Sequence, residues 1–158
     1  MNKQKTISNT RFVFAYSNVG YNLLGELIER VSGMTYAEYL EISIFEPLNM
    51  INTNAGFNSS MSKGYDKTKE IQTVGKNVEA SRSVNSSVAD MTNFLKMMMG
   101  EGSFNGEQIF KKETIALMRN DYTTEIPLDS THASRFGMGV YSIRFGEEGE
   151  FSSDWGCG

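Results

Sequence analysis

Tyr16 and Asn18 stand where an apolar run, RFVFAY at residues 11–16, gives way to a helical pattern. A phenol can relay a proton when a nearby cation lowers its pKa, and a carboxamide can both donate to and accept from a substrate amide. In an extended segment, residues two apart point the same way, so we expect these two side chains to lie side by side with Ser17 turned away. Together they can hold an amide and move a proton.

The same residues also have a purely structural interpretation. Asn18 is a good N-cap for the helix that follows it, and Tyr16 can simply end a strand, because aromatic and β-branched residues favour strands. Taken alone, these residues favour the structural interpretation. The choice therefore depends on what the rest of the chain predicts.

Two consecutive helices follow this junction. The first runs from Val19 to a glycine cap at Gly33. Its apolar side consists of Leu23, Leu24, Leu27, Ile28 and Val31, and its polar side of Glu26, Glu29 and Arg30. The second begins at Thr35, because Glu38 three residues later completes a capping box, and it should end before Pro47. The side chains expected to point inward from it are Tyr36, Tyr39, Leu40 and Phe45.

A long polar stretch and a third helix come next. Residues 50–85 are rich in turn formers and are expected to be irregular. The third helix should begin near Ser86 or Ser87 and stop at Gly100. Its apolar side is expected to carry Val88, Met91, Phe94, Leu95, Met98 and Met99. The methionine cluster at residues 97–99 is read as core filler, with an adaptable binding face as the alternative.

The last third of the chain adds strands to this helical region. A tight turn is predicted at Asn105-Gly106, a short fourth helix over residues 111–120, and a β-hairpin that turns at residues 147–149.

Composition excludes several classes of function. The 158 residues suit one domain, and the net charge of −4 argues against a nucleic-acid surface. One cysteine, Cys157, excludes an intrachain disulfide, and one histidine, His132, without clustered carboxylates argues against a metal site. No apolar run is long enough to span a membrane. The basic N-terminus lacks the apolar region of a secretory signal, so as written the chain would stay in the cytoplasm.

A family resemblance covers roughly residues 11–145. It is carried first by FAYSNVGYNLLGELIERVSGMTYAEYLEISIFEPLNMINT, then by SRSVNSSVADMTNFLKMMMGEG, GEQIFKKETIALM and FGMGV. In their types and order these segments resemble the Tyr-x-Asn region and the following elements of the serine β-lactamase-related family. That family includes class C β-lactamases, D-alanyl-D-alanine carboxypeptidases and related esterases. The resemblance implies an α+β fold of the β-lactamase/transpeptidase type, in which helices pack on an antiparallel sheet. This chain would supply the helical region and one β-hairpin of that sheet.

The resemblance also implies a chemistry. Tyr16 matches the tyrosine that takes part in proton transfer to and from a nucleophilic serine, and Asn18 matches the residue that binds the substrate's amide carbonyl. The serine attacks an acyl carbon, and water or another acceptor then releases the acyl-enzyme. The substrate would be a small molecule or peptide with an acyl group, and neither a metal nor an organic cofactor is implied.

Two elements of the family pattern are missing. No Ser-x-x-Lys precedes Tyr16, and the one that occurs, Ser60 to Lys63, lies downstream in the irregular stretch, where chance accounts for it. A Lys or His two residues before a Gly is also expected on a strand, but the chain reads Asp154-Trp155-Gly156 near that place. An aspartate cannot supply the positive charge needed there.

His132 is a conceivable substitute for the missing Lys or His, and Cys157 a conceivable reactive thiol. The segment around His132 is predicted to be a loop, in which a lone histidine is usually a surface residue. Cys157 has no partner motif and is read as incidental.

We therefore expect residues 1–158 to be a single partial domain that lacks the Ser-x-x-Lys segment and the C-terminal strands of the sheet. Alone it should be inactive, as part of a hydrolase of β-lactams, D-Ala-D-Ala peptides or esters. Two alternatives remain: a non-catalytic module that binds cell-wall peptides, and an interaction domain that dimerises or is completed by another chain, since sheet edges pair readily. The compartment of a longer parent stays open, because the family is often secreted or bound to the cell envelope.

Overall fold

The computed structural model describes residues 16–59, 61–71, 79–120, 122, 134–145 and 149–153. The chain divides into two compact units. The larger unit is Ser17–Ile109, and the smaller comprises Met1–Tyr16 with Phe110–Gly158. Each unit is described by itself below.

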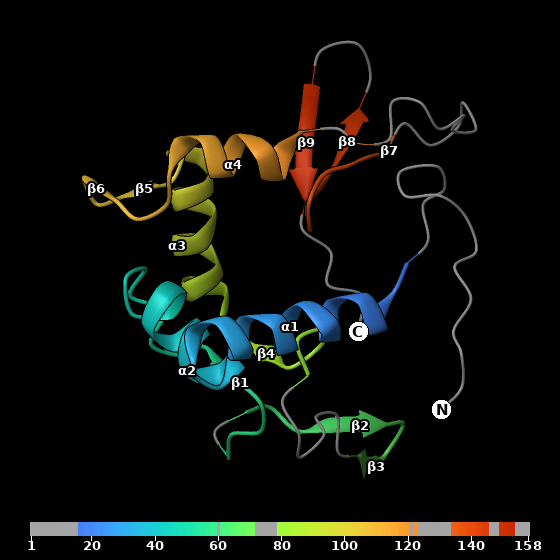
Figure 1. Cartoon of the computed structure of the whole chain (residues 1–158). Helices are drawn as coiled ribbons and strands as arrows, with labels where there is room; N and C mark the ends of the chain where they lie inside the picture. The colour runs from blue at the N-terminus through green and yellow to red at the C-terminus, as the bar shows by residue number, and fades with distance from the viewer. Residues whose placement is uncertain are drawn as a thin grey trace, which may run out of the picture. The chain divides into compact units, whose positions relative to one another are not determined.

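Helix α1, Asn18–Ser32, begins the larger unit (Figure 1). It ends as predicted at Gly33, which has a positive φ of 73° and whose N–H donates to the carbonyl of Glu29 at 2.9 Å. A left-handed residue at this position costs least when it is glycine. The chain can therefore turn at once into the next helix.

Helix α2, Tyr36–Leu40, continues as a wider π-helical turn, η1, Glu41–Phe45. The predicted capping box is confirmed: the Glu38 N–H donates to Thr35 Oγ1 at 3.3 Å, and the Thr35 N–H donates to Glu38 Oε2 at 2.9 Å. Leu40 and Phe45 are buried as expected. Tyr36 and Tyr39 are half-buried, so this helix places one side in the core.

Helix α3, Val88–Met99, is capped by Ser87, whose Oγ accepts from the Asp90 N–H at 3.2 Å. Of the residues predicted for its apolar side, Met98 is buried, but Val88, Leu95 and Met99 are exposed. The most deeply buried methionine is instead Met97. Core filling is thus confirmed for two of the three clustered methionines.

The core of the larger unit gathers around α3. Its buried apolar residues are Leu40, Phe45, Leu48, Met50, Met97, Met98 and Phe104. Strand β5, Ser103–Phe104, pairs with β6, Glu107–Gln108, across the predicted turn. Asn105 and Gly106 have φ values of 50° and 88° there, which suits an Asn-Gly hairpin turn.

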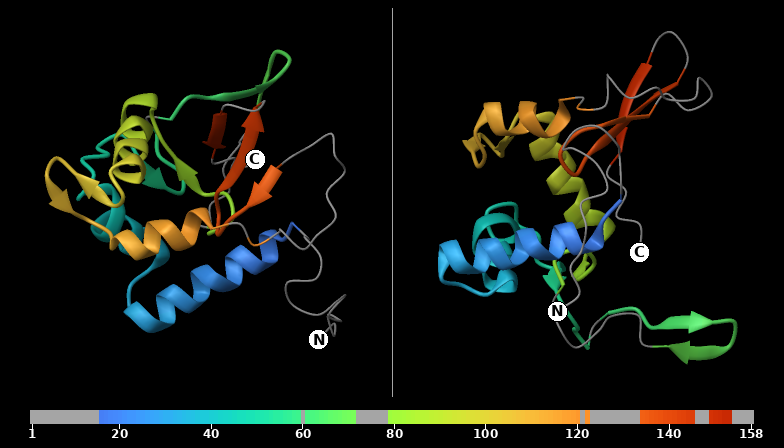
Figure 2. Two further views of the ribbon diagram at one scale, coloured as in Figure 1. Left: turned by 90° about the horizontal axis from the view of Figure 1, so that it is seen from above. Right: turned by 45° about the vertical axis from the view of Figure 1, so that its right-hand side comes forward.

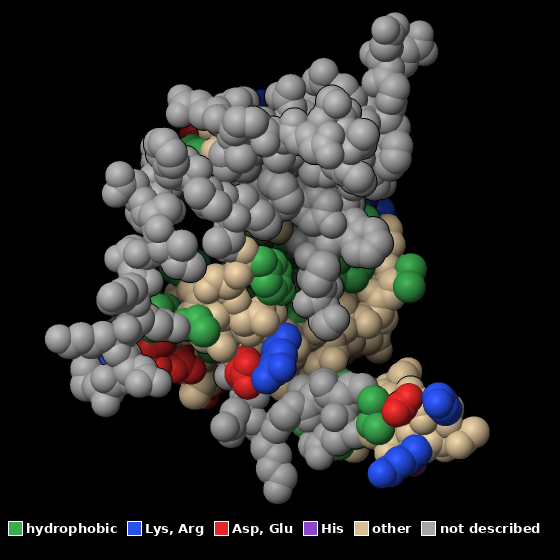
Figure 3. Space-filling view, turned by 90° about the vertical axis from the view of Figure 1, so that its right-hand side faces the viewer, with side chains coloured by type: hydrophobic (Ala, Val, Ile, Leu, Met, Phe, Trp, Pro, Cys, Tyr) green, Lys and Arg blue, Asp and Glu red, His purple; other side chains and the backbone are tan. Residues whose placement is uncertain are grey.

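The stretch over residues 50–85 is more regular than predicted. Strand β1, Asn54–Ala55, pairs with β4, Val84–Asn85. Strands β2, Gly64–Asp66, and β3, Lys69–Ile71, form an antiparallel hairpin. Its acidic and basic side chains lie side by side in Figure 3. The prediction failed because this hairpin exposes nearly all its side chains and so lacks an alternating apolar pattern.

The smaller unit contains the predicted fourth helix and a small sheet. Helix α4 spans Lys112–Arg119. Strands β7 (Ser134–Phe136), β8 (Tyr141–Phe145) and β9 (Gly149–Ser153) form an antiparallel sheet in the order β7-β8-β9 (Figure 2). The predicted hairpin is β8–β9, and its turn lies outside the described residues. Separate helices and small antiparallel sheets confirm the α+β class.

The helix and sheet of this unit are joined at one close approach. The Met138 N–H donates to the Met118 carbonyl at 2.9 Å. A Cβ added at Gly137 would lie 2.0 Å from that carbonyl oxygen, so only glycine fits there. Ile115 and Val140 are the buried apolar residues of the described part of this unit.

Candidate active site

Ser17, not Asn18, caps helix α1. The Ser17 backbone is extended, with φ −146° and ψ 99°, and its Oγ accepts a hydrogen bond from the Gly20 N–H at 3.0 Å. The structural interpretation of Asn18 as the N-cap is therefore wrong by one residue. Serine and asparagine are equally good caps, so sequence preference could not decide between them.

Asn18 is instead the first residue of the helix, and it is exposed. Its carboxamide makes no hydrogen bond to any residue that the structure describes. Because Ser17 satisfies the first turn of the helix, the Asn18 side chain retains both its donor and its acceptor. It can therefore bind an amide group presented from solvent.

Tyr16 directly precedes the cap and is 58% exposed. It belongs to the smaller unit, whereas Ser17 begins the larger one. The side-by-side placement of the Tyr16 phenol and the Asn18 carboxamide therefore remains a prediction.

The side of α1 that carries Asn18 also carries Asn22 and Glu29. At 100° per residue, these three residues fall within a narrow polar sector of the helix. Asn22 Oδ1 accepts a hydrogen bond from the Ser81 N–H at 3.0 Å, and Glu29 Oε1 accepts one from the Tyr36 N–H at 2.8 Å. The polar side of α1 thus faces the rest of the larger unit.

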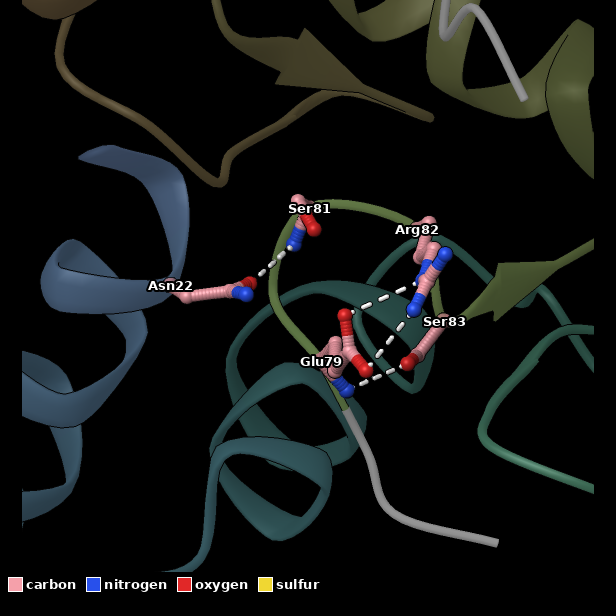
Figure 4. Close-up of polar contacts among 5 residues, drawn as sticks. All are labelled: Asn22, Glu79, Ser81, Arg82 and Ser83. Atoms are coloured by element: carbon pink, nitrogen blue, oxygen red, sulfur yellow. Dashed lines mark hydrogen bonds and ion pairs between the residues drawn. The ribbon is translucent and has the colours of Figure 1, made fainter. Parts of the chain in front are cut away.

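The segment that accepts this contact from Asn22, residues 79–83, is held together by hydrogen bonds and an ion pair of its own (Figure 4). Arg82 donates to both carboxylate oxygens of Glu79, each at 3.0 Å. The Glu79 N–H donates to Ser83 Oγ. The hydrogen bonds and charge of Arg82, with a smaller contribution from Asn22, hold the pKa of Glu79 below its ordinary value. Glu79 in turn raises the pKa of Arg82, so the pair stays ionised.

Helix α1 approaches this segment very closely. Gly25 is the one buried residue of the helix, and a Cβ added to it would lie 2.6 Å from the Cβ of Ala80. Within the described residues, the Ser81 hydroxyl has no hydrogen-bond partner. The segment is therefore held to α1 through its backbone and through this close contact.

A hollow of about 170 Å³ lies between α1, α2 and this segment. Its lining consists of Asn22, Gly25, Glu26, Glu29, Tyr36, Glu79 and Ala80. Burial raises the pKa of the Tyr36 phenol. Three carboxylates make the lining acidic, yet the described part of the chain contains no His, Cys, Asp and Glu cluster arranged to hold a metal. The hollow is thus a polar gap beside the candidate site.

The alternative nucleophile motif, residues 60–63, directly precedes the β2–β3 hairpin in the sequence. Ser60 lies outside the described residues, but Lys63 Nζ pairs with Glu70 Oε2 at 2.9 Å and its side chain is 64% exposed. Strand β2 follows Lys63 directly, rather than a buried helix. This environment does not match that of an activated serine and lysine.

The remaining residues named in the sequence analysis lie outside the described residues. These are His132, Asp154, Trp155, Gly156 and Cys157. Among the helices that the structure describes, none combines the length and hydropathy of a membrane span.

Sequence reasoning missed Asn22, Glu79 and Arg82. Asn22 had a usable signal, because it follows Asn18 by one helical turn on the polar side of a predicted helix. Its partner segment is 59 residues away in the chain, and no local pattern indicates that contact.

The chain matches a protein family over most of its length and two curated relatives over shorter segments. The family model described as Beta-lactamase matches residues 8–147. "Probable hydrolase clz13" from Cochliobolus lunatus is 41% identical over 54 residues, which are 34% of this chain and 9% of that protein. "Penicillin-binding protein 4*" from Bacillus subtilis (strain 168) is 53% identical over 38 residues, which are 24% of this chain and 8% of that protein.

A solved structure extends the similarity to nearly the whole chain. The octameric penicillin-binding protein homologue from Pyrococcus abyssi superposes with a TM-score of 0.72 and 27% identity. The match covers 92% of this chain and 34% of that chain. The chain therefore spans about a third of this solved relative and less than a tenth of the two curated ones.

Proposed function

The chain belongs to the beta-lactamase family of serine hydrolases, and we propose that it forms one wall of an active site that works through an acyl-enzyme. The substrate is a β-lactam, a D-Ala-D-Ala peptide or a small ester. Tyr16 is the proton-transfer residue and Asn18 the substrate-binding residue. The nucleophilic serine lies outside these 158 residues.

The proposed reaction has two steps. The serine oxygen attacks the acyl carbon and loses its proton, and the departing nitrogen or oxygen receives a proton as its bond to the acyl carbon breaks. Water then adds to the ester, and the serine regains its proton as the acid leaves. In each step the Tyr16 hydroxyl relays the proton, while the Asn18 N–H donates to the amide carbonyl of the substrate.

The observation that supports this role most directly is the position of Asn18. The side-chain oxygen of a capping asparagine would accept a hydrogen bond from a backbone N–H of the helix. Here Ser17 makes that bond, and Asn18 is left exposed at the start of a helix whose polar side is otherwise engaged. An exposed carboxamide fixed at a helix N-terminus suits recognition of a substrate amide.

The part of the proposal that concerns the nucleophile is tested by intact mass spectrometry. The purified, folded chain is exposed to a fluorescent penicillin and, separately, to a fluorophosphonate. We expect no adduct, because the proposal puts the activated serine outside these 158 residues. A stoichiometric adduct at Ser60 would instead identify Ser60 as the nucleophile and make the chain a small enzyme of its own.

The role of Asn18 is tested by binding. Addition of a D-Ala-D-Ala peptide should shift the amide resonances around Asn18, and Asn18→Ala should weaken binding about tenfold, the effect of one hydrogen bond of about 1.4 kcal/mol. Lys96→Ala, an exposed change on α3, is the control. Equal binding by both variants would remove Asn18 from the site. Binding without turnover in every longer form of the protein would favour the non-catalytic alternative.

A partner chain is part of this proposal. The Pyrococcus abyssi homologue is described as octameric. This supports assembly with further copies or with a complementing chain as the way in which the proposed site is completed.

A further inference from the structure

Asn22 makes the side-chain hydrogen bond that lies nearest to Asn18 among those described between helix α1 and other segments. It follows Asn18 by four residues, so it lies about 6 Å further along the helix axis and on the same side. Its Oδ1 accepts a hydrogen bond from the Ser81 N–H at 3.0 Å, and Figure 4 shows the carboxamide pointing toward that group. Asn22 thus joins the part of α1 that carries Asn18 to a segment 59 residues further along the chain.

The segment that Asn22 binds, residues 79–83, is itself fixed to the larger unit. The Arg82 and Ser83 N–H groups both donate to the Glu79 carbonyl, at 3.1 Å and 3.0 Å, so the segment forms a closed turn. Ser83 is buried, and its carbonyl accepts from the Gly56 N–H at 2.7 Å. Strand β4 follows directly and pairs with β1. A hydrogen bond to this segment therefore holds α1 against a well-packed part of the unit.

The other attachments of α1 described above lie further from Asn18. Gly25 and Glu29 contact the rest of the unit about 10 Å and about 16 Å beyond Asn18 along the helix axis. The first turn of a helix has N–H groups without intrahelical partners, and helix ends open more easily than their middles. Without the bond made by Asn22, the first turns of α1 would therefore extend freely beyond the contact at Gly25.

We propose that Asn22 is a positioning residue for Asn18. This inference rests on the proposed function, in which the Asn18 carboxamide binds the substrate amide. Ordering a loose side chain or helix end during binding reduces affinity, so a substrate-binding group works best when it is held in place beforehand. The bond from Asn22 to the Ser81 N–H holds the first turns of α1 and so keeps the Asn18 carboxamide in one position.

A merely structural role for Asn22 predicts a different result, because any polar contact of similar strength would then affect binding equally. The chain offers a matched comparison in Asn93 on helix α3. Asn93 Nδ2 donates to the carbonyls of Leu48 and Asn49, at 3.1 Å and 3.4 Å, so this side chain also joins a helix to a distant segment. Asn93→Ala therefore removes a comparable contact and leaves the attachment of α1 intact.

The first experiment is an NMR titration of the whole chain and its variants with a D-Ala-D-Ala peptide. We expect Asn22→Ala to weaken binding about fivefold, less than the loss of about tenfold for Asn18→Ala, because the carboxamide is present but no longer held. Asn93→Ala should bind within about twofold of the unsubstituted chain, although urea unfolding should show a similar loss of stability. Added to Asn18→Ala, the change Asn22→Ala should weaken binding no further, since no carboxamide is left to position.

Three results of this titration would overturn the inference. Undiminished binding by Asn22→Ala, with weaker binding by Asn18→Ala, would remove Asn22 from the site and leave the proposed function intact. Equal weakening by Asn22→Ala and Asn93→Ala would mean that binding simply follows stability. Fully additive losses for Asn18→Ala and Asn22→Ala would mean that the two residues act independently.

A second measurement needs no ligand, so it also applies if Asn18→Ala leaves binding unchanged and the proposed function fails. Residual dipolar couplings of the backbone N–H groups of residues 18–21 report how steadily the first turns of α1 are held. In Asn22→Ala these couplings should be reduced relative to those of residues 26–32, because the first turns then open locally. In Asn93→Ala the ratio should not change. An unchanged ratio in Asn22→Ala would overturn the inference whatever the binding result.

Discussion

Helices α1 and α3 begin in the same way and are used differently. Both start at a serine whose Oγ accepts a backbone N–H of the first turn. Helix α3 buries Asp90, Met97 and Met98, whereas α1 buries only Gly25. Met97 is 1% exposed and Leu27 is 55% exposed. A capping signal and an apolar side thus determine that a helix forms, while the surrounding fold determines which side is covered.

Asp90 connects α3 to the turn before β1. Its carboxylate accepts from the Asn52 N–H and from Thr53 Oγ1, each at 2.7 Å. Burial alone would raise the pKa of Asp90, but its hydrogen bonds with Thr53, Asn52 and Ser87 outweigh burial and hold the pKa below its ordinary value. Helix α1 has no comparable buried charge.

The largest difference should appear when this charge is removed. Asp90→Ala removes the acceptor of the Asn52 N–H and of the Thr53 hydroxyl. It should lower the free energy of unfolding by about 4 kcal/mol, from about 2 kcal/mol for each hydrogen bond to a charged group. Asp66→Ala on the exposed hairpin should change it by less than about 0.5 kcal/mol. Urea unfolding at pH 7 measures both, and equal effects would remove Asp90 from its structural role.

The same carboxylate predicts a dependence on pH. Because the folded pKa lies below the unfolded value of about 3.9, the stabilisation is complete above that value and is lost as the pH falls through the folded pKa. The free energy of unfolding of the unsubstituted chain should therefore fall more steeply with decreasing pH below about pH 4. Asp90→Asn should flatten this region, and an unchanged profile would contradict the assignment.

Truncation of one apolar side chain on each helix compares α3 with α1 directly. Met97→Ala should cost about 3 kcal/mol, because it leaves a cavity in a packed core. Leu27→Ala on α1 should change stability by less than about 0.5 kcal/mol in the isolated chain. Thermal unfolding of both variants measures the two losses of stability. A large effect of Leu27→Ala would show that the apolar side of α1 is already covered in the isolated chain.

Two glycines of α1 test how closely this helix packs on its two sides. Gly25→Ala should destabilise by about 1–2 kcal/mol, because the new methyl would overlap Ala80. Gly20→Ala meets nothing closer than 3.4 Å and should stabilise by up to about 1 kcal/mol through helix propensity. Denaturant midpoints of the two variants should therefore move in opposite directions, and a shared direction would contradict the close approach at Gly25.

The smallest expected effect concerns Asn22. Asn22→Ala removes one hydrogen bond to the Ser81 N–H and should cost about 1 kcal/mol. Hydrogen exchange of the Ser81 amide should accelerate more than that of the core amides of α3. A uniform acceleration would instead indicate a loss of global stability.

Local signals made much of this fold predictable. The Thr35–Glu38 capping box, the Gly33 cap and the Asn105-Gly106 turn each depend on residues within one turn of one another. Their geometry is therefore contained in a short stretch of sequence. The same holds for the end of α3 at Gly100.

Contacts between distant residues were not predictable in this way. The cap of α1 fell on Ser17 rather than Asn18, since both types satisfy a helix N-terminus. Asp90 could be seen as a first-turn acid, but its bonds to Asn52 and Thr53 join residues 37 or 38 apart. The same limit applies to the candidate site. The structure places Asn18 within the larger unit, whereas the position of the Tyr16 phenol next to the Asn18 carboxamide remains a prediction.

Helix α1 can rotate as a rigid rod about Gly33, so a small rotation there moves its far end by a large distance. A 15-residue helix is about 22 Å long, so a rotation of about 5° at Gly33 would move Asn18 by about 2 Å. The hydrogen bond between Asn22 and the Ser81 N–H lies near the N-terminal end of α1, far from Gly33, where it restrains such rotations most effectively. Displacements of about 1 Å suffice to slow an enzymatic reaction greatly. The joint at Gly33, the Glu29–Tyr36 bond across it and the contacts of Gly25 and Asn22 along the helix therefore together set how accurately the Asn18 carboxamide is positioned.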